Sequence, residues 1–265
     1  MDDFKQFKEL QKQGWAHFAP LETFTIPAAA QLVRHSRMRS GQRVLDVACG
    51  TGPVAVTAAR AGATVNGIDL TPQLLDRARE NAALAGVNVD FREADVEQLP
   101  FSDAEFDVVV SQFGHMFAPR PDVAVREMMR VLKPGGTIAF STWPPELLVG
   151  RTFGVVGRYA PPPPPGAASP PLWGDPRVVT ERLGDAVKNI VFDRQRMLYP
   201  ALSASHARVF FERTAGPVIK IVEMLATSDP ARLEAFRREY EALVADYYED
   251  NIIRQDYLMT RATKR

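Results

Sequence analysis

The chain has 265 residues, of which 46% are hydrophobic, and its 32 basic residues balance its 32 acidic ones. This length and composition suffice for a buried core and fit one large domain. The zero net charge provides no overall attraction to nucleic acid, and the single cysteine excludes an internal disulfide or a thiolate metal cluster. Because the sequence has neither a leader nor a long apolar run, we expect a cytoplasmic protein with no membrane or nucleic-acid partner and no metal.

In the middle of the chain, short runs rich in Val, Ile and Phe alternate with helix-like stretches. The strand-like runs cover residues 43–47, 64–69, 87–95, 106–111 and 137–142. Between them, residues 71–86 and 122–132 carry apolar side chains at helical spacing, and Pro72 suits the first turn of the earlier helix. This alternation predicts right-handed βαβ units, and therefore an α/β fold with a doubly wound, mostly parallel sheet.

The pattern changes beyond residue 143, where strands and helices no longer alternate. Residues 161–176 are rich in proline and cannot form a helix or a central strand, so we expect an irregular covering loop. The five consecutive prolines have two interpretations, a ligand for an adaptor domain or a stiff surface spacer, of which the spacer is preferred.

The last third of the sequence combines two strand-like segments with a helical stretch between them. Residues 190–199 predict one strand, residues 204–250 are helical in pattern, and residues 251–265 predict an antiparallel strand at the sheet edge. A helix that begins at Asp229-Pro230 carries an apolar stripe made of Leu233, Phe236, Tyr240, Leu243 and Tyr247. The stripe fits a lid packed onto the sheet or a dimer seam. We favour the lid, and the chain is expected to be a monomer or a homodimer.

These segments define the expected domain organisation. Residues 1–265 form a single domain, in which residues 1–36 are an N-terminal helical lid and residues 37–142 are the core that binds a cofactor. Residues 143–187 are a proline-rich and helical covering segment. Residues 188–265 supply the last strands, with a helical cap inserted at about 204–250.

Residues 44–52, VLDVACGTG, join an apolar strand to a glycine turn ahead of a helix. Gly50 and Gly52 match the start of the dinucleotide fingerprint, with Asp69 after the next strand as a ribose ligand. A pyrophosphate at this turn, however, would be repelled by Asp46, four residues before the first glycine. That carboxylate suits a ligand with an ammonium group and no phosphate, such as S-adenosylmethionine.

VLDVACGTG resembles the first motif of class I S-adenosylmethionine-dependent methyltransferases, in particular small-molecule enzymes of methyltransferase type 11, related to quinone biosynthesis. Further signals follow in order, namely NGIDLT, READVEQLPF, FDVVVS and RVLKPGG, and together they cover about residues 43–142. WGDPRVVTERL, residues 173–183, is similar to the segment before the sixth strand of related bacterial members. The resemblance implies a Rossmann-like sheet of seven strands, one of them antiparallel, and a small-molecule acceptor.

The resemblance also assigns residues to a cofactor site. Gly50 and Gly52 would let the backbone approach the methionine portion, and Asp46 would hold the ammonium end or the local hydrogen-bond network. Asp69 would accept hydrogen bonds from the ribose hydroxyls, and Asp95 would receive the adenine amino group. The other residues that the resemblance places at the cofactor are Trp15, Ala48, Leu70, Val96 and Ser111.

An acceptor site is expected where the fourth strand ends, at residues 111–119. Ligands in this fold lie outside the carboxyl ends of the strands, so His115 is the candidate general base. A packing histidine is the alternative. The residues expected to line an apolar, aromatic acceptor pocket are Phe18, Phe113, Met116, Phe153, Trp173, Phe210 and Tyr247.

The expected reaction is transfer of a methyl group from S-adenosylmethionine to an oxygen or carbon of a small molecule, by in-line displacement. S-adenosylhomocysteine would be the product. Methylation of a small-molecule nitrogen remains an alternative. A nucleotide-dependent oxidoreductase is a further hypothesis, which Asp46 and the ordered motifs make weaker. A cofactor-binding protein that keeps the fold without catalytic activity is the other alternative, and the sequence leaves it open.

Overall fold

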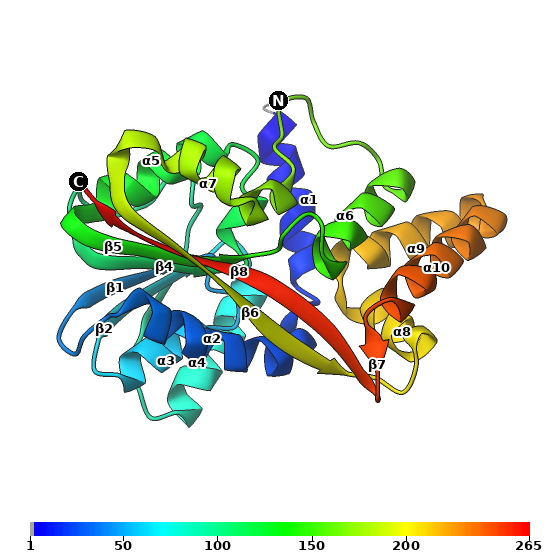
Figure 1. The fold of residues 1–265 in the computed structure, drawn as a ribbon, viewed down its shortest axis with the longest axis horizontal. Helices are drawn as coiled ribbons and strands as arrows, with labels where there is room; N and C mark the ends of the chain where they lie inside the picture. Colours follow the sequence, from blue (N-terminus) through cyan, green and yellow to red (C-terminus); the bar gives the residue numbers. More distant parts are fainter. Residues whose placement is uncertain (1–2) are drawn as a thin grey trace.

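The computed structural model of the protein describes residues 3–265, and its centre is a twisted mixed sheet (Figure 1). Seven strands follow the order β3-β2-β1-β4-β5-β8-β6, and a short eighth strand, β7, pairs with β8. The strands are β1 (Arg43–Val47), β2 (Thr64–Asp69), β3 (Asp90–Glu93), β4 (Phe106–Gln112), β5 (Leu132–Thr142), β6 (Val187–Pro200), β7 (Tyr248–Glu249) and β8 (Ile252–Lys264).

The central strands are parallel and buried on both faces. β1 pairs in parallel with β2 and with β4, and β5 extends the parallel set beyond β4. All residues of β1 and β2 after the first are buried, as expected for central parallel strands covered on both faces. β8 runs antiparallel to both neighbours, so the prediction of a mostly parallel, seven-stranded sheet with one antiparallel strand is confirmed.

The position predicted for the last strand is wrong. β8 lies between β5 and β6, and β6 forms the edge of the sheet (Figure 1). Residues 257–260 are buried in succession, as befits a strand with neighbours on both sides. Alternating polar and apolar residues elsewhere in 251–265 suggested an edge strand. In the structure, β8 follows the cap helices in the chain and pairs with β5.

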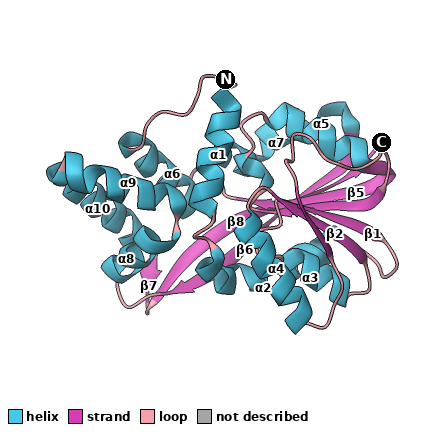
Figure 2. Ribbon diagram, turned by 180° about the vertical axis from the view of Figure 1, so that it is seen from behind, coloured by secondary structure: helices cyan, strands magenta, loops and turns pink. Residues whose placement is uncertain are grey.

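Two layers of helices cover the sheet (Figure 2). One face carries α2, α3 and α4, and the other carries α5 and α7. A proline stands in the first turn of α3, α4, α5 and α7, where its missing N–H costs no hydrogen bond. The bounds are α2 (Glu22–Ser36), α3 (Pro53–Arg60), α4 (Pro72–Leu84), α5 (Pro121–Val131) and α7 (Pro176–Leu183).

A helical cap stands at one end of the sheet, where β6 and β8 project beyond the other strands (Figure 1). It contains α6 (Leu148–Tyr159), α8 (Ala204–Thr214), α9 (Gly216–Ser228) and α10 (Pro230–Ala245), and Asp229 caps α10 by accepting the Arg232 amide at 3.0 Å. The stripe residues Leu233, Phe236, Tyr240 and Leu243 are buried in a second apolar cluster within the chain. The stripe is therefore buried inside this chain, where α10 packs mainly against α6, α8 and α9 and not on the central sheet.

Helix α1 (Asp3–Trp15) lies between the core and the cap (Figures 1 and 2). It packs against α9, where Gly14 and Gly216 bring the two backbones together. The short 3₁₀ helices η1 (Ala19–Leu21), η2 (His115–Phe117), η3 (Pro170–Gly174) and η4 (Gly184–Ala186) occur in connections. Residues 161–169 contain no helix or strand, as the proline content predicts, but η3 and the start of α7 occupy residues 170–174 and 176, where an irregular loop was expected. No helix within residues 3–265 is long and apolar enough to cross a membrane.

Candidate active site

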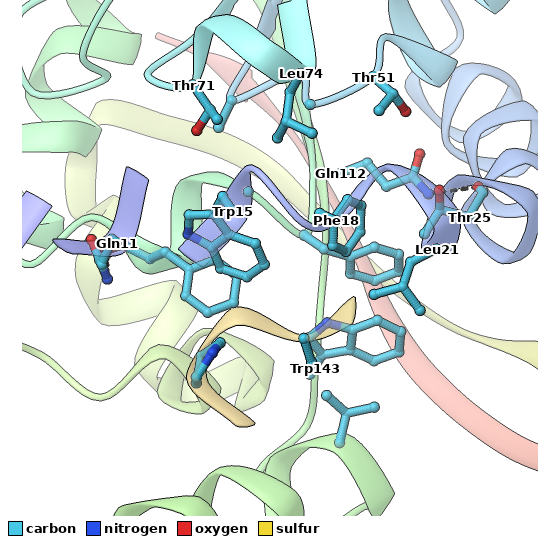
Figure 3. Close-up of a pocket in the computed structure, with 18 of the residues that line it drawn as sticks. Gln11, Trp15, Phe18, Leu21, Thr25, Thr51, Thr71, Leu74, Gln112 and Trp143 are labelled. Carbon is cyan, nitrogen blue, oxygen red and sulfur yellow. Dashed lines mark hydrogen bonds between the residues drawn. The ribbon is translucent and has the colours of Figure 1, made fainter. Parts of the chain in front are cut away.

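A cavity of about 330 Å³ opens at the carboxyl ends of β1, β2 and β4, under α1 and the cap. This is the edge of a doubly wound sheet where ligands bind. Aromatic rings of Trp15, Phe18 and Trp143 gather around the space, and Gln112 projects toward it from the end of β4 (Figure 3). The side-chain amide nitrogen of Gln112 donates to the Thr25 carbonyl at 2.8 Å. The side-chain oxygen of Gln112 is buried and has no hydrogen-bond partner among the described residues.

The glycine turn after β1 forms one wall of the cavity. Gly50 has φ of +56°, and a Cβ at this position would meet open space, so the backbone itself is exposed to a ligand. Gly52, with φ of +79°, does not line the cavity, and a Cβ there would press against Phe91 and Ala78. Gly52 therefore serves the packing of α3 rather than contact with a ligand.

Asp69 ends β2 and supports this turn. Its Oδ2 accepts the Gly50 amide at 2.8 Å, and its Oδ1 accepts the Thr71 amide at 2.9 Å. The residue is 8% exposed and lines the cavity, and burial raises the pKa of its carboxyl group. Asp69 thus fixes the glycine turn and retains acceptor capacity toward the cavity, since each carboxylate oxygen has two lone pairs.

Asp46, near the end of β1, is less well satisfied. Its Oδ2 accepts the Ala55 amide at 3.0 Å, whereas its Oδ1 is buried without a partner among the described residues. Burial, together with the charge of Asp69, raises the pKa of Asp46 to about 8. The cavity wall therefore contains a carboxyl group whose ionised form a bound cation would stabilise.

These contacts decide between the two interpretations of the glycine turn. A pyrophosphate needs free amides at the turn and at the start of the following helix. Here the Gly50 amide is donated to Asp69 and the Ala55 amide, in the first turn of α3, is donated to Asp46. Two carboxylates of the protein occupy the positions that would attract an anion, so the turn favours a cationic ligand over a dinucleotide.

Asp95, after β3, ties the cavity to helix α1. Its Oδ2 accepts from Lys8 at 2.6 Å, and Lys8 also donates to Glu97 at 2.5 Å. Glu97 is nearly inaccessible and additionally pairs with Arg120, while Lys12 pairs with the exposed Glu93. Lysines of α1 thus hold that helix over the cavity.

The structure brings most of the predicted site residues to one cavity. The residues lining the cavity are Trp15, Phe18, Asp46, Ala48, Gly50, Asp69, Leu70, Asp95, Val96, Phe113 and Phe153. Those that lie outside it are Gly52, Ser111, His115, Met116, Trp173, Phe210 and Tyr247. Ser111 instead donates to the Val47 carbonyl at 2.7 Å and accepts the His115 amide at 3.0 Å.

His115 is a core residue and does not face the cavity. It is fully buried, with ring centroids of Phe140 and Trp173 each 4.6 Å from its own. Burial, aided by the charge of Arg182, lowers the pKa of His115 to about 3. Because η2 turns the side chain toward the core, the structure corresponds to the packing alternative and not to a general base.

The remaining acceptor candidates outside the cavity are also explained by packing. Met116 and Trp173 are buried to 1% exposure in the sheet core. Phe210 packs against Phe24 and Tyr199 behind the cavity wall. Tyr247 follows α10 and receives a hydrogen bond from Arg151 at 3.3 Å. None of these four side chains is positioned to contact a ligand in the cavity.

Several lining residues were missed by the sequence analysis. They come from α2, from the segment after β5, from β6 and β8 and from α10, and include Phe24, Trp143, Met197, Tyr199, Tyr240 and Gln255. Trp143 stacks on Phe113 with centroids 4.0 Å apart. Tyr240 belongs to the predicted apolar stripe, so helical spacing indicated its burial but not the cavity beside it.

Comparisons with known proteins agree with this geometry. The family model described as "Methyltransferase domain" matches residues 45–140. An uncharacterised protein of Mycobacterium tuberculosis is 36% identical over 245 residues, covering 92% of this chain and 89% of that protein. The ubiquinone biosynthesis O-methyltransferase of Hahella chejuensis is 35% identical over 146 residues, covering 54% of this chain and 61% of the relative.

A solved structure supports the same fold. A putative methyltransferase from Bacillus halodurans superposes with a TM-score of 0.61 at 22% identity, covering 89% of this chain and 98% of that one. At this identity the match concerns the fold alone. The family match and the sequence relatives go further, and show that the chain belongs to the S-adenosylmethionine-dependent methyltransferases.

Proposed function

We propose that this protein transfers the methyl group of S-adenosylmethionine to an oxygen or carbon atom of a small, apolar or aromatic molecule. The observation that carries the proposal is one continuous cavity with two unlike ends. Asp46, Gly50 and Asp69 line it at the strand ends, whereas Phe153, Phe211 and Val244 line it at the cap. A charged, hydroxylated cofactor suits the first end and an apolar acceptor suits the second.

The residues at the strand ends fit this cofactor. An ammonium group would provide the partner that the buried Oδ1 of Asp46 lacks. Asp69 has acceptor capacity left for the ribose hydroxyls, and Gly50 presents backbone where a side chain would fill the space. Leu70 and Val96 supply apolar surface for adenine, beside Asp95.

The bound cofactor would supply a methyl group attached to a sulfonium. The methyl carbon is electrophilic because its leaving group is a neutral thioether, so the protein need not activate it. The chain's own task is to align the acceptor and to exclude water. Trp15 and Phe18 close the cavity on the side of α1, and Phe113 with Trp143 forms a stacked wall on the other side. These rings keep the reacting atoms in an apolar environment.

No histidine is among the described residues that line the cavity. We therefore propose an acceptor whose reacting atom ionises readily or is already nucleophilic, such as a phenol or an enolisable carbon. Such an acceptor requires orientation more than a strong base.

The test is a methyl-transfer assay with isotopically labelled S-adenosylmethionine and a panel of phenols, hydroquinones, enolisable diketones and aromatic amines. Labelled product is expected with oxygenated aromatic or enolic acceptors, and mass spectrometry locates the added methyl group. At sub-saturating S-adenosylmethionine, Asp46→Asn should reduce the activity at least ten-fold, while exchange of the exposed Asp185 for Asn should not. Transfer only to amines, or to no acceptor in the panel, would contradict the proposal.

A further inference from the structure

The floor of the cap end is one face of the ribbon formed by β6 and β8. Met197 pairs with Gln255 and Tyr199 pairs with Ile253 in the antiparallel register. Alternate residues of a strand point to the same face, and all four of these side chains line the cavity. The projecting ribbon therefore places two polar side chains, Tyr199 and Gln255, under the cap.

A third polar side chain reaches the same region from above. Tyr240 of α10 lines the cavity, and the ring of Phe211 lies 6.3 Å from Tyr240 and 5.5 Å from Tyr199, measured between centroids. Tyr199 also packs against Phe24 with centroids 4.5 Å apart. The two tyrosines thus share an aromatic wall although they lie on different elements.

These three side chains are deeply buried and lack hydrogen-bond partners. Tyr199 is 2% exposed, Tyr240 is 4% exposed and Gln255 is 7% exposed. Within residues 3–265, no hydrogen bond engages either hydroxyl or the Gln255 amide, whereas Thr25 and Thr152 on the same wall donate to backbone carbonyls. All three side chains line the cavity, so their hydroxyl and amide groups can bind a polar group of a ligand.

We propose that the acceptor is a planar ring compound with a neutral carbonyl or phenolic oxygen, and that Tyr199, Tyr240 and Gln255 bind this oxygen at the cap end. This inference rests on the proposed function, because it concerns the acceptor of the same cavity. The aromatic side chains around the tyrosines fit the faces and edges of a ring. The polar groups fix the direction in which the ring enters.

The ionisation of the tyrosines agrees with this role. Burial raises the pKa of Tyr199 to about 12 and raises the pKa of Tyr240 further above its usual value. Both hydroxyls therefore remain protonated near neutral pH and can donate to an oxygen. They are binding groups and not bases.

The charges around the cavity exclude an ionic group at the cap end. The cationic side chains that line the described cavity are Lys8 and Lys12 of α1, which pair with Asp95 and Glu93. The acidic lining residues belong to the strand ends. A carboxylate, a phosphate or an ammonium group on the acceptor would thus find no counter-charge between Tyr199 and Tyr240, whereas a neutral oxygen would be satisfied.

The experiment compares ring compounds that differ only in their oxygen. Naphthalene, 2-naphthol and 2-naphthoate are titrated by calorimetry into the protein, with and without S-adenosylhomocysteine. Wild-type protein should bind 2-naphthol at least about five-fold more tightly than naphthalene, since one hydrogen bond contributes about 1 kcal/mol. Binding of 2-naphthoate should be weaker than that of 2-naphthol.

The variants are Tyr199→Phe, Tyr240→Phe, the double variant and Gln255→Met, which retain the ring or chain packing. Each should reduce the preference for 2-naphthol several-fold without changing naphthalene binding, and the double tyrosine variant should abolish it. Tyr247→Phe, outside the cavity, is the control and should behave like wild type. Thermal unfolding checks that each variant is folded.

Four results would each overturn this inference. The protein could bind naphthalene and 2-naphthol equally, or bind 2-naphthoate more tightly than 2-naphthol. The preference for 2-naphthol could survive in the double variant, or no ring compound could bind. These readouts measure binding and do not require methyl transfer. A protein that shows the oxygen preference but methylates nothing would contradict the proposed function alone. A protein that methylates amines or aliphatic molecules with no oxygen preference would contradict the inference.

Discussion

Asp69 accepts backbone amides through both of its carboxylate oxygens, whereas Asp46, on the neighbouring strand, accepts through Oδ2 alone. The charge of Asp69 also helps to raise the pKa of Asp46, although burial is the larger cause. One carboxylate is therefore structural, and the other is held in an unfavourable state that a bound ammonium group would relieve. The relationship links the stability of the free protein to its affinity for the cofactor.

Asp46→Asn should stabilise the free protein and weaken ligand binding. The folded-state pKa of Asp46, about 8, exceeds the unfolded value of 3.8, so the folded state holds an extra proton between these pH values. Wild-type stability therefore falls as pH rises through this window. The variant lacks this loss, and its Tm should exceed that of wild type by several degrees at pH 8 but little at pH 4.

The same variant should lose at least ten-fold in affinity for S-adenosylhomocysteine. Calorimetry at pH 7 in buffers of different ionisation enthalpy should show that wild type releases about one proton on binding, because the ammonium group favours the ionised carboxylate. Asp185→Asn, at an exposed position, is the control. Unchanged affinity in Asp46→Asn would argue against an ammonium contact.

His115 should affect acid stability and not ligand binding. Its pKa falls from 6.5 in the unfolded chain to about 3 in the folded protein, so the unfolded state binds more protons between these values. Wild-type stability should therefore decline as pH falls from about 6.5 toward 3. His115→Leu should flatten this part of the curve measured by denaturant unfolding. An unchanged pH dependence would show that His115 is accessible to protons in the folded state.

Lys8 should contribute more than Lys12 to holding α1. Lys8 is mostly buried and bridges Asp95 and the buried Glu97, whereas Lys12 pairs with the exposed Glu93. Lys8→Met should accelerate hydrogen exchange in residues 3–15 and weaken S-adenosylhomocysteine binding several-fold. Lys12→Met should change stability by less than about 1 kcal/mol. Equal effects of the two substitutions would contradict the assignment of Lys8 as the main anchor.

The contact between α1 and α9 should be sensitive to a single methyl group. A Cβ at Gly216 would come within 2.5 Å of the Gly14 backbone, so Gly216→Ala should separate the helices and cost about 1–3 kcal/mol. Gly154→Ala on α6 meets open space and should stabilise the protein by up to about 1 kcal/mol. Thermal unfolding distinguishes the two, and a neutral Gly216→Ala would show that α1 is loosely packed.

The central strands were predictable because they are continuous buried runs. β1 and β2 have the predicted bounds, residues 43–47 and 64–69. β5 was predicted to begin at residue 137, but it begins at Leu132 and includes Lys133-Pro134-Gly135-Gly136, which has the composition of a turn. A register shift in the pairing of β4 and β5 accommodates this segment, and such a shift depends on the neighbouring strand and not on local sequence.

The part of the cavity at the strand ends was predictable for a similar reason. Asp46, Gly50 and Asp69 occupy the ends of recognisable strands, and parallel strands bring their carboxyl ends together. The cap end was not predictable, because Tyr199 and Gln255 meet only through the pairing of β6 with β8. His115 was misplaced because the single turn η2 sets the direction of its side chain.

The central claim is tested most directly by calorimetric titration of S-adenosylhomocysteine and of a nicotinamide dinucleotide into wild type, Gly50→Ala and Gly41→Ala. Both glycines have positive φ and open space at Cβ, but only Gly50 lines the cavity. Wild type and Gly41→Ala should bind S-adenosylhomocysteine with similar affinity, Gly50→Ala at least ten-fold more weakly, and none should bind the dinucleotide. Binding of the dinucleotide, or undiminished S-adenosylhomocysteine binding by Gly50→Ala, would contradict the account.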